Sequence, residues 1–107
     1  MKKLTSIQSK YLRGLAHALK PVVFVGQKGV TDALFKSTDE AFQRHELIKV
    51  KFIDFKEKEQ KKTIAATIEN KTNSRMAGMI GHIAIFYKPH TDPDKRKIVL
   101  PNNPPQN

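Results

Sequence analysis

Hydrophobic residues recur at helical spacing in three parts of the chain. The first stripe predicts a helix at about residues 5–18, which Pro21 would end. The second stripe predicts a helix from residue 31 to residue 45, and the third predicts a shorter helix at residues 63–72. Residues 54–62 are charged with balanced signs, so we expect a connector there.

Strand patterns fall between these helices. Residues 22–25 form a continuous β-rich run, which is typical of a strand buried on both faces. We therefore assign Phe24 to the core. Residues 47–53 alternate instead, with Lys49 and Lys51 on the polar face, and this pattern predicts a strand with one wet, basic face.

The last part of the chain has the pattern of a hairpin. Residues 75–80 and 83–87 are predicted strands, and Gly81-His82 between them is a two-residue turn signal. Residues 98–100 are apolar and could add a short edge strand.

Together these elements have the order α-β-α-β-α-β-β. Alternating helices and strands predict an α/β domain with two layers, and the closing hairpin makes its four-stranded sheet mixed. We expect this domain to occupy residues 1–100. Residues 101–107 are rich in Pro and Asn, and we expect a disordered tail there.

Composition narrows the class of protein. The chain has 107 residues, which suits one domain, and it contains no Cys. A disulfide framework, a thiolate zinc site and a cysteine nucleophile are therefore excluded. No apolar run approaches the ~20 residues of a membrane span, and no signal-peptide pattern follows Met1. We expect a soluble protein of the cytoplasm, without a membrane partner.

Charge is the strongest compositional signal. Twenty basic and ten acidic residues give a net charge of +10. Residues 1–31 contain six basic residues and no acidic one, residues 32–70 are balanced, and residues 71–107 are again basic. Such a field attracts polyanions. The charge alone does not distinguish RNA from DNA or from a membrane surface.

One glycine motif joins a predicted strand to a predicted helix. Gly26-Gln27-Lys28-Gly29 lets the backbone approach a ligand closely, and the helix capped by Thr31 presents free N–H groups. Lys28 adds a full charge. The motif can therefore seat a phosphate, as the Gly-x-x-Gly loop of KH modules does. A tight turn that merely uses glycine explains the same spacing, and the pattern alone leaves both readings open.

Catalytic patterns are absent from the sequence. It lacks a P-loop, a dinucleotide fingerprint and a nucleophile elbow, and its four histidines form no metal-spaced pair. We expect no enzyme, no cofactor, no metal and no small-molecule substrate. Aromatic residues make up only 7% of the chain, so extensive base stacking is not expected.

Three ordered motifs resemble a known family. They are residues 19–31 (LKPVVFVGQKGVT), residues 45–51 (HELIKVK) and residues 80–88 (IGHIAIFYK). This chain resembles the CRM domain, whose name stands for chloroplast RNA splicing and ribosome maturation, and in particular its stand-alone bacterial YhbY-like members. The resemblance covers roughly residues 4–100. The family often has Lys directly after the first Gly of the loop, where this chain has Gln27.

The resemblance implies a fold similar to the C-terminal domain of a bacterial translation initiation factor. It also implies RNA binding through the Gly-x-x-Gly loop and an adjoining basic surface. For a single-domain member it implies association with ribosomal RNA in precursors of the large ribosomal subunit. We expect a monomer.

The candidate RNA-binding residues follow from the loop, from the basic surface and from the resemblance. The loop supplies Gly26, Gln27, Lys28 and Gly29, with Thr31 as the helix cap. The residues expected to extend the contact are Lys20, Arg44, Lys49, Lys51 and Lys88, with Lys10 and Arg13 on the first helix. The alternatives are a general nucleic-acid binder, a module that docks a ribosomal protein, and a small RNA-modifying or nucleotide-using enzyme, which has no motif behind it.

Overall fold

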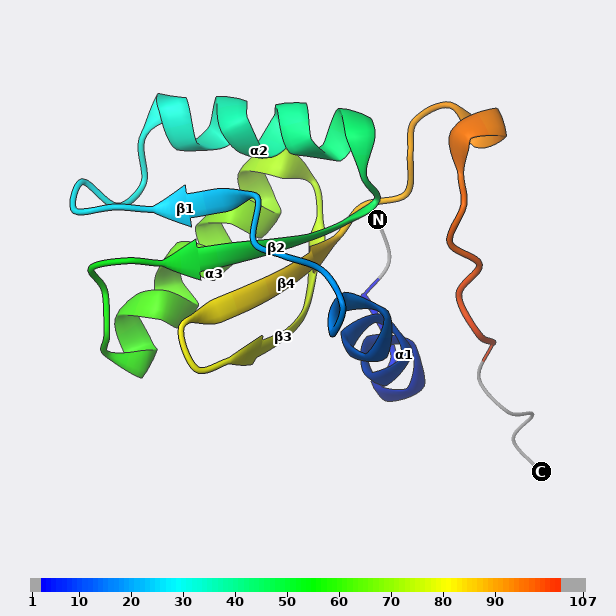
Figure 1. Ribbon diagram of the computed structural model, residues 1–107, viewed down its shortest axis with the longest axis horizontal. Coiled ribbons are helices and arrows are strands. Elements are labelled where there is room, and N and C mark those ends of the chain that lie inside the picture. Colours follow the sequence, from blue (N-terminus) through cyan, green and yellow to red (C-terminus); the bar gives the residue numbers. More distant parts are fainter. Residues whose placement is uncertain (1–2, 103–107) are drawn as a thin grey trace.

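The computed structural model describes residues 3–102 (Figure 1). Within this range the helices are α1 (Ser6–Ala16), α2 (Asp32–Arg44) and α3 (Lys58–Thr72), and the strands are β1 (Val23–Val25), β2 (Leu47–Phe52), β3 (Arg75–Ile80) and β4 (Ile83–Tyr87). A 3-10 turn, η1 (Pro93–Lys95), lies in the C-terminal segment. The predicted order α-β-α-β-α-β-β is confirmed.

The strands form one mixed sheet, as predicted. Its order is β1-β2-β4-β3; β1 runs parallel to β2, and the other two pairs are antiparallel. A parallel pair needs a crossover connection, and α2 supplies it. β1 is therefore an edge strand, and the loop from β1 to α2 opens at this edge of the sheet (Figure 1).

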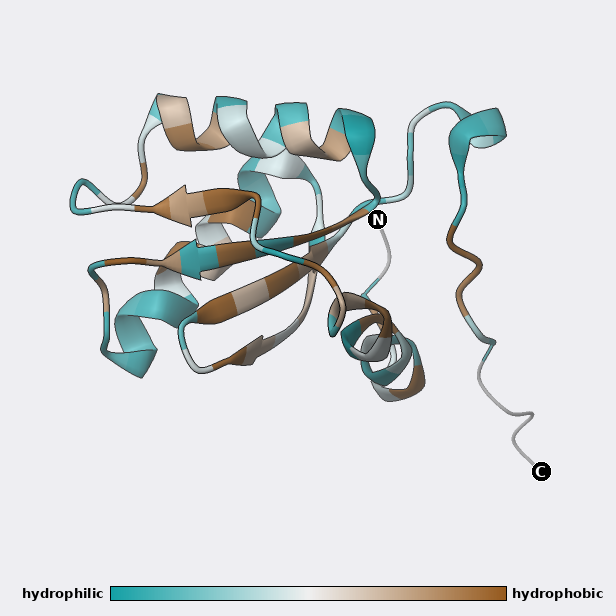
Figure 2. Ribbon diagram, viewed as in Figure 1, coloured by the Kyte–Doolittle hydropathy of each residue, from teal (hydrophilic) through white to brown (hydrophobic). Residues whose placement is uncertain are grey.

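Helices lie on both faces of the sheet. α2 and α3 pack on one face through the larger core cluster, which includes Leu34, Phe42 and Ile68. α1 packs on the other face through Leu12 and Ala16. The expected two layers are thus the sheet with α2 and α3, and α1 adds a partial third layer. Figure 2 shows the strands mainly in the brown of apolar residues and α3 largely in teal.

The third helix begins earlier than the apolar periodicity predicts. It starts at Lys58, five residues before the predicted start at residue 63. Its first turns consist of Lys, Glu and Gln, which have good helix propensity without needing an apolar face. The buried Lys61 amine donates to the carbonyl of Gly81 at 2.6 Å and lies 3.4 Å from His82 Nδ1, so this turn also holds the β3–β4 hairpin.

The first strand is not buried on both faces, so the assignment of Phe24 to the core is wrong. Val23 and Val25 are buried, but 55% of Phe24 is exposed. Successive side chains of a strand point to opposite faces, and α2 covers only one face of β1. α1 contacts β2, β3 and β4. Phe24 therefore stands on an uncovered part of the sheet.

The predicted edge strand at residues 98–100 is also wrong. The backbone there is irregular, and the N–H groups of Lys97 and Ile98 donate to Glu46 Oε1 at 2.6 and 2.9 Å instead of to a neighbouring strand. Ile98 still packs against the α1 side of the sheet. In the predicted tail, the Pro101 carbonyl accepts from Gln8 Nε2 at 3.2 Å, and residues 103–107 lie outside the described residues.

Glu46 anchors this C-terminal segment to the sheet. The side chain is 8% exposed, and its second carboxylate oxygen accepts from the His90 N–H at 2.9 Å. Burial alone would raise the pKa of Glu46, but the N–H groups of Ile98, Lys97 and His90 outweigh burial and hold this pKa below its ordinary value. The carboxylate is thus kept ionised by backbone donors.

Candidate nucleic-acid interface

The loop predicted to seat a phosphate lies at the exposed end of β1. It closes as a turn, in which the Gly29 N–H donates to the Gly26 carbonyl at 3.0 Å. Gly29 is buried with φ +66°, and a Cβ there would lie 3.1 Å from Phe55 Cζ. Position 29 therefore requires glycine for both its backbone and its packing.

The other glycine of the loop has a different environment. Gly26 is exposed, and the nearest atom to a Cβ at this position would be Asp54 Oδ2, 4.0 Å away. Within residues 3–102, the space over Gly26 is therefore open. The two glycines of the motif thus have separate roles: Gly29 shapes the turn, and Gly26 leaves backbone open to a ligand.

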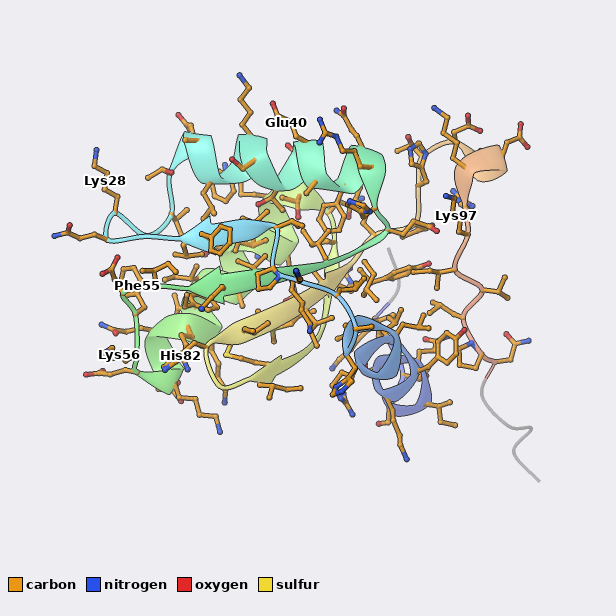
Figure 3. All side chains as sticks on the ribbon, viewed as in Figure 1. Lys28, Glu40, Phe55, Lys56, His82 and Lys97 are labelled. Carbon is orange, nitrogen blue, oxygen red and sulfur yellow. The ribbon has the colours of Figure 1, made fainter. Side chains whose placement is uncertain are left out.

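Phe55 packs against the loop, and the sequence pattern did not predict this contact. The half-buried ring comes from the segment after β2 and lies against Gly29, near Lys56 at the same end of the molecule (Figure 3). A single aromatic residue within a charged connector is the only signal that could have indicated this role.

The N-terminus of α2 follows directly after the loop. Thr31 caps it, as predicted: its Oγ1 accepts from the Leu34 N–H at 3.1 Å. Lys28 is exposed and its side chain extends away from the protein (Figure 3). The positive end of the helix, the Lys28 ammonium and the open backbone of Gly26 are therefore within one short stretch of chain. Asp32 and Asp54 are the acidic residues next to this stretch.

A groove between β1 and α2 starts at this loop. Its first hollow has a volume of about 490 Å³ and is lined by the loop and by Phe24, Thr31 and Ser37. A second hollow of about 240 Å³ is also lined by Ser37 and reaches Arg44. α2 has 13 residues, so the groove extends about 20 Å at 1.5 Å per residue. We call these two hollows the β1–α2 groove. The predicted loop residues line one end of this groove, and Arg44 lines the other end together with Glu40.

Two of the predicted basic residues are engaged elsewhere. Lys49 Nζ donates to the Leu19 carbonyl at 2.8 Å and lies 3.5 Å from the His17 carbonyl, so it holds the connector from α1 to β1. Arg13 donates to the Ala77 carbonyl at 2.9 Å and lies over β3, where a Cβ on Gly78 would collide with it. The structure gives both side chains backbone partners away from the β1–α2 groove.

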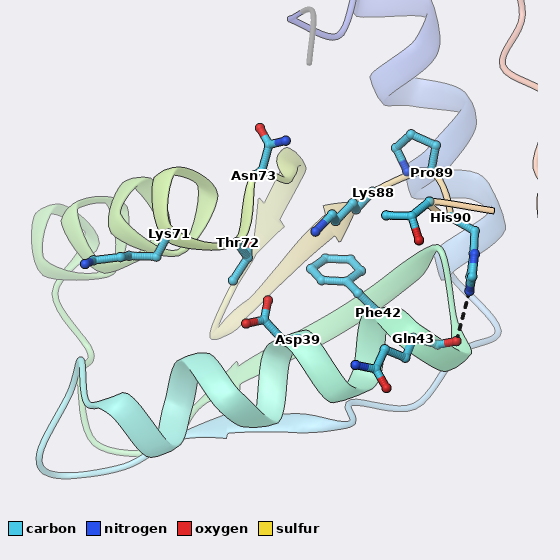
Figure 4. Close-up of a pocket in the computed structure, with 10 residues that line it drawn as sticks. Asp39, Phe42, Gln43, Lys71, Thr72, Asn73, Lys88, Pro89 and His90 are labelled. Atoms are coloured by element: carbon cyan, nitrogen blue, oxygen red, sulfur yellow. Dashed lines mark hydrogen bonds between the residues drawn. The ribbon is translucent and has the colours of Figure 1, made fainter. Parts of the chain in front are cut away.

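The remaining predicted cations are distributed over four places. Lys20 is exposed in the connector before β1, Lys51 is exposed on β2 beside Phe24, and Lys10 is exposed on α1. Lys88 lines a separate cavity of about 500 Å³ on the other flank of α2 (Figure 4). This cavity carries Asp39 as well as Lys88 and Lys71, so its walls have mixed charge. The structure does not bring Lys10 or Lys88 to the loop.

Two other features, a metal site and a membrane-spanning helix, have no candidate in the described part of the chain. Within residues 3–102 no group of three or more His, Cys, Asp or Glu side chains is placed to hold a metal ion. None of the helices in that range has both the length and the apolar character needed to cross a membrane.

Comparison with known proteins finds a matching family model and several similar proteins. The family model of the CRS1 / YhbY (CRM) domain matches residues 4–88. An RNA-binding protein of Haemophilus influenzae is 38% identical over 94% of this chain and 98% of its own length. The Probable RNA-binding protein YqeI of Bacillus subtilis is 35% identical over 92% of this chain and 99% of its own. The solution structure of the hypothetical protein SAV1595 from Staphylococcus aureus superposes with a TM-score of 0.79 at 32% identity, covering 92% of this chain and 99% of that one.

Proposed function

The chain belongs to the CRS1 / YhbY (CRM) domain family, and from this membership we propose that it is an RNA-binding protein without catalytic activity. One observation carries the proposal: the open Gly26 backbone, Lys28 and the capped N-terminus of α2 line the same hollow at the entrance of the β1–α2 groove. Such a meeting of backbone N–H groups, helix dipole and full charge suits a phosphate.

The path of the RNA backbone follows from the groove. One phosphate lies over Gly26 and Lys28, and the next phosphates follow α2 towards Arg44. Lys20 and Lys51 are exposed near β1 and supply further charge. Lys49 and Arg13 act differently in this account, because they hold α1 and its connector in place.

We further propose that the RNA is ribosomal RNA in precursors of the large ribosomal subunit, where the protein acts as an assembly factor in the cytoplasm. The support is the resemblance to stand-alone bacterial members of the family. Relatives of nearly the same length, such as the one from Haemophilus influenzae, are matched from end to end.

A salt-titrated binding assay tests the class of ligand. It compares a fragment of large-subunit ribosomal RNA with duplex DNA of matched length and follows the logarithm of affinity against the logarithm of salt concentration. We expect a preference for RNA that persists at about 0.15 M salt. Equal affinities that fall together would identify a general nucleic-acid binder. Cross-links to ribosomal proteins without RNA affinity would identify a protein-docking module.

Variants of Gly26 test the phosphate seat. Gly26→Asp adds a negative charge where the structure leaves space, and Gly26→Asn adds nearly the same volume without charge. We expect Gly26→Asp to reduce RNA affinity at least about tenfold more than Gly26→Asn does, since charge-assisted hydrogen bonds to phosphate are the strong ones. Equal affinities of the two variants would contradict the seat.

Lys28→Ala tests the same seat from the cationic side. We expect it to weaken the binding of all RNA sequences about equally, because a phosphate contact carries no base information. It should also lower the salt slope by about one. Lys3→Ala removes the same charge from the exposed residue ahead of α1 and serves as the matched control. A loss limited to some sequences, or the same loss in both variants, would contradict the assignment.

A further inference from the structure

The sheet has an uncovered region on the face that carries α1. The strand register places four side chains in one row across all four strands: Phe24 pairs with Lys51, Lys51 with Ile83, and Ile83 with Ile80. Their neighbours Val25, Val50 and Ala84 point into the core on the other face, so these four share the α1 face. We call these four residues the open row.

Helix α1 does not reach the open row. Its cluster contains Ala77, Ile85 and Tyr87, which lie further along β3 and β4. Figure 1 shows α1 across one end of the sheet, while the strand ends near the loop from β1 to α2 remain uncovered. Phe24 is 55% exposed and Ile80 is 63% exposed. These two exposed apolar side chains stand at the two ends of the open row, with Lys51 and the partly buried Ile83 between them, so the row as a whole is open to a partner.

The charge of this surface favours a nucleic acid. Lys51 is the single charged member of the open row, and it lies beside Phe24 on the neighbouring strand, about 4.8 Å away in the backbone. Asp54 is the acidic residue near this corner, at the Gly26 end of the loop. The chain as a whole carries +10, which favours an anionic partner, and the exposed Phe24 ring favours a partner with flat apolar groups; a nucleic acid supplies both.

The open row is also continuous with the proposed phosphate seat. Phe24 is two residues from Gly26, and it lines the first hollow of the β1–α2 groove together with the loop. β1 is an edge strand, so no further strand of the described chain separates the groove from the open row. A nucleotide with its phosphate over Gly26 has only this edge to cross for its base to reach the Phe24 ring.

From these observations we propose that Phe24 is a stacking platform for one unpaired base of the bound RNA, with Lys51 holding the phosphate of that nucleotide or its neighbour. The inference rests on the proposed RNA-binding function and adds the class of substrate: RNA with at least one single-stranded, splayed base. One stacked base is compatible with the expectation from composition that base stacking is not extensive.

Substitutions at Phe24 test the platform. The probe is a single-stranded RNA of about 12 nucleotides that carries 2-aminopurine at one position, moved along the strand in successive probes. We expect Phe24→Ala to weaken binding about five- to 150-fold and Phe24→Leu to weaken it nearly as much, since stacking is lost in both. Phe24→Tyr keeps the flat ring and should bind as the wild type does. Val99→Ala removes part of another exposed apolar side chain, 82% exposed and outside the strands, and is the control.

The fluorescence of the probe locates the stacked base. At one position 2-aminopurine should be quenched by the wild type and by Phe24→Tyr, but not by Phe24→Ala. An abasic nucleotide at this position should cost little extra in Phe24→Ala, because the two changes remove the same contact. Thermal unfolding of each variant shows whether it is folded. Because Phe24 is more than half exposed, we expect melting temperatures close to that of the wild type.

The outcomes separate this inference from the function on which it rests. If Gly26→Asp strongly lowers RNA affinity and Phe24→Ala does not, the platform is refuted and the phosphate seat stands. The platform is also refuted if the wild type binds a fully paired RNA helix as tightly as a single strand, or if Phe24→Ala lowers affinity without changing the quenching at any position. If the wild type binds no RNA of either kind, the proposed function itself fails.

Discussion

Substitution of Gly29 by Ala should destabilise the protein, while the same substitution at Gly26 should not. Gly29 has φ +66°, a conformation that costs an L-residue about 1–2 kcal/mol. The added Cβ would also lie 3.1 Å from Phe55 Cζ, so the ring or the loop must shift. At Gly26 the nearest atom would be 4.0 Å away, which is ordinary contact.

These values translate into a measurable difference in melting temperature. For a domain of this size, 1–2 kcal/mol lowers the melting temperature by about 4–16 °C. We therefore expect Gly29→Ala to melt well below the wild type in a thermal unfolding experiment followed by circular dichroism, and Gly26→Ala to melt within a few degrees of it. Combining Gly29→Ala with Phe55→Leu should cost less than the sum of the two single changes, because both affect one contact.

The result that would refute this reasoning is equal stability of the two glycine variants. It would mean that neither the left-handed backbone of Gly29 nor the nearby Phe55 ring makes position 29 unfavourable for alanine. The separation of roles within the motif, one glycine for the turn and one for the ligand, would then be lost. An additive double variant would refute only the contact with Phe55 and would leave the backbone argument standing.

Three further predictions follow from the contacts of charged side chains. The Glu46 carboxylate has a lowered pKa in the folded protein. Its stabilising effect is therefore present above the ordinary pKa of about 4.5 and is lost as the pH falls through the folded pKa. In thermal melts at different pH values, Glu46→Gln should reduce this loss of stability at acidic pH. Lys49→Met should lower the free energy of unfolding by about 1 kcal/mol in denaturant unfolding and leave the salt slope of RNA binding unchanged. Lys51→Met should leave the free energy of unfolding unchanged and lower the salt slope. Lys61→Met should increase amide hydrogen exchange in the β3–β4 hairpin, because the Gly81 carbonyl loses its donor; unchanged exchange would show that the amine does not hold the turn.

Much of the fold was predictable because local and long-range signals agree. The alternation in β2, the turn at Gly81 and the Thr31 cap each specify one element, and the structure contains all three. The parallel pairing of β1 with β2 follows from the helix between them. The family resemblance pointed to the same α/β fold.

The surface of the sheet was harder to predict. An apolar run such as residues 22–25 reads as buried on both faces, and whether a helix covers the second face depends on where α1 packs. Nothing in the run itself shows that α1 lies over β3 and β4 and leaves Phe24 open. The exposure of that ring is therefore a tertiary fact, and the function proposed for it could come only from the structure.

The roles of the cations were also beyond the sequence pattern. Lys49 and Lys51 alternate on the same face of β2 and look equivalent in the sequence. The structure separates them, because the connector from α1 passes over Lys49, and carbonyl groups of the connector accept hydrogen bonds from the Lys49 amine. Arg13 is drawn to the Ala77 carbonyl in the same way, at the position where Gly78 leaves space for its side chain.

The most direct test of the account is a titration of the isotope-labelled protein with the ribosomal RNA fragment, followed by the amide signals in NMR spectra. We predict that the largest changes occur at Gly26, Lys28 and Gly29 and continue through the groove side of α2 to Arg44. The amides of α3, which lines neither hollow of the groove, should change little. Changes concentrated on α3 or around the cavity at Lys88, with the loop unaffected, would contradict the central claim.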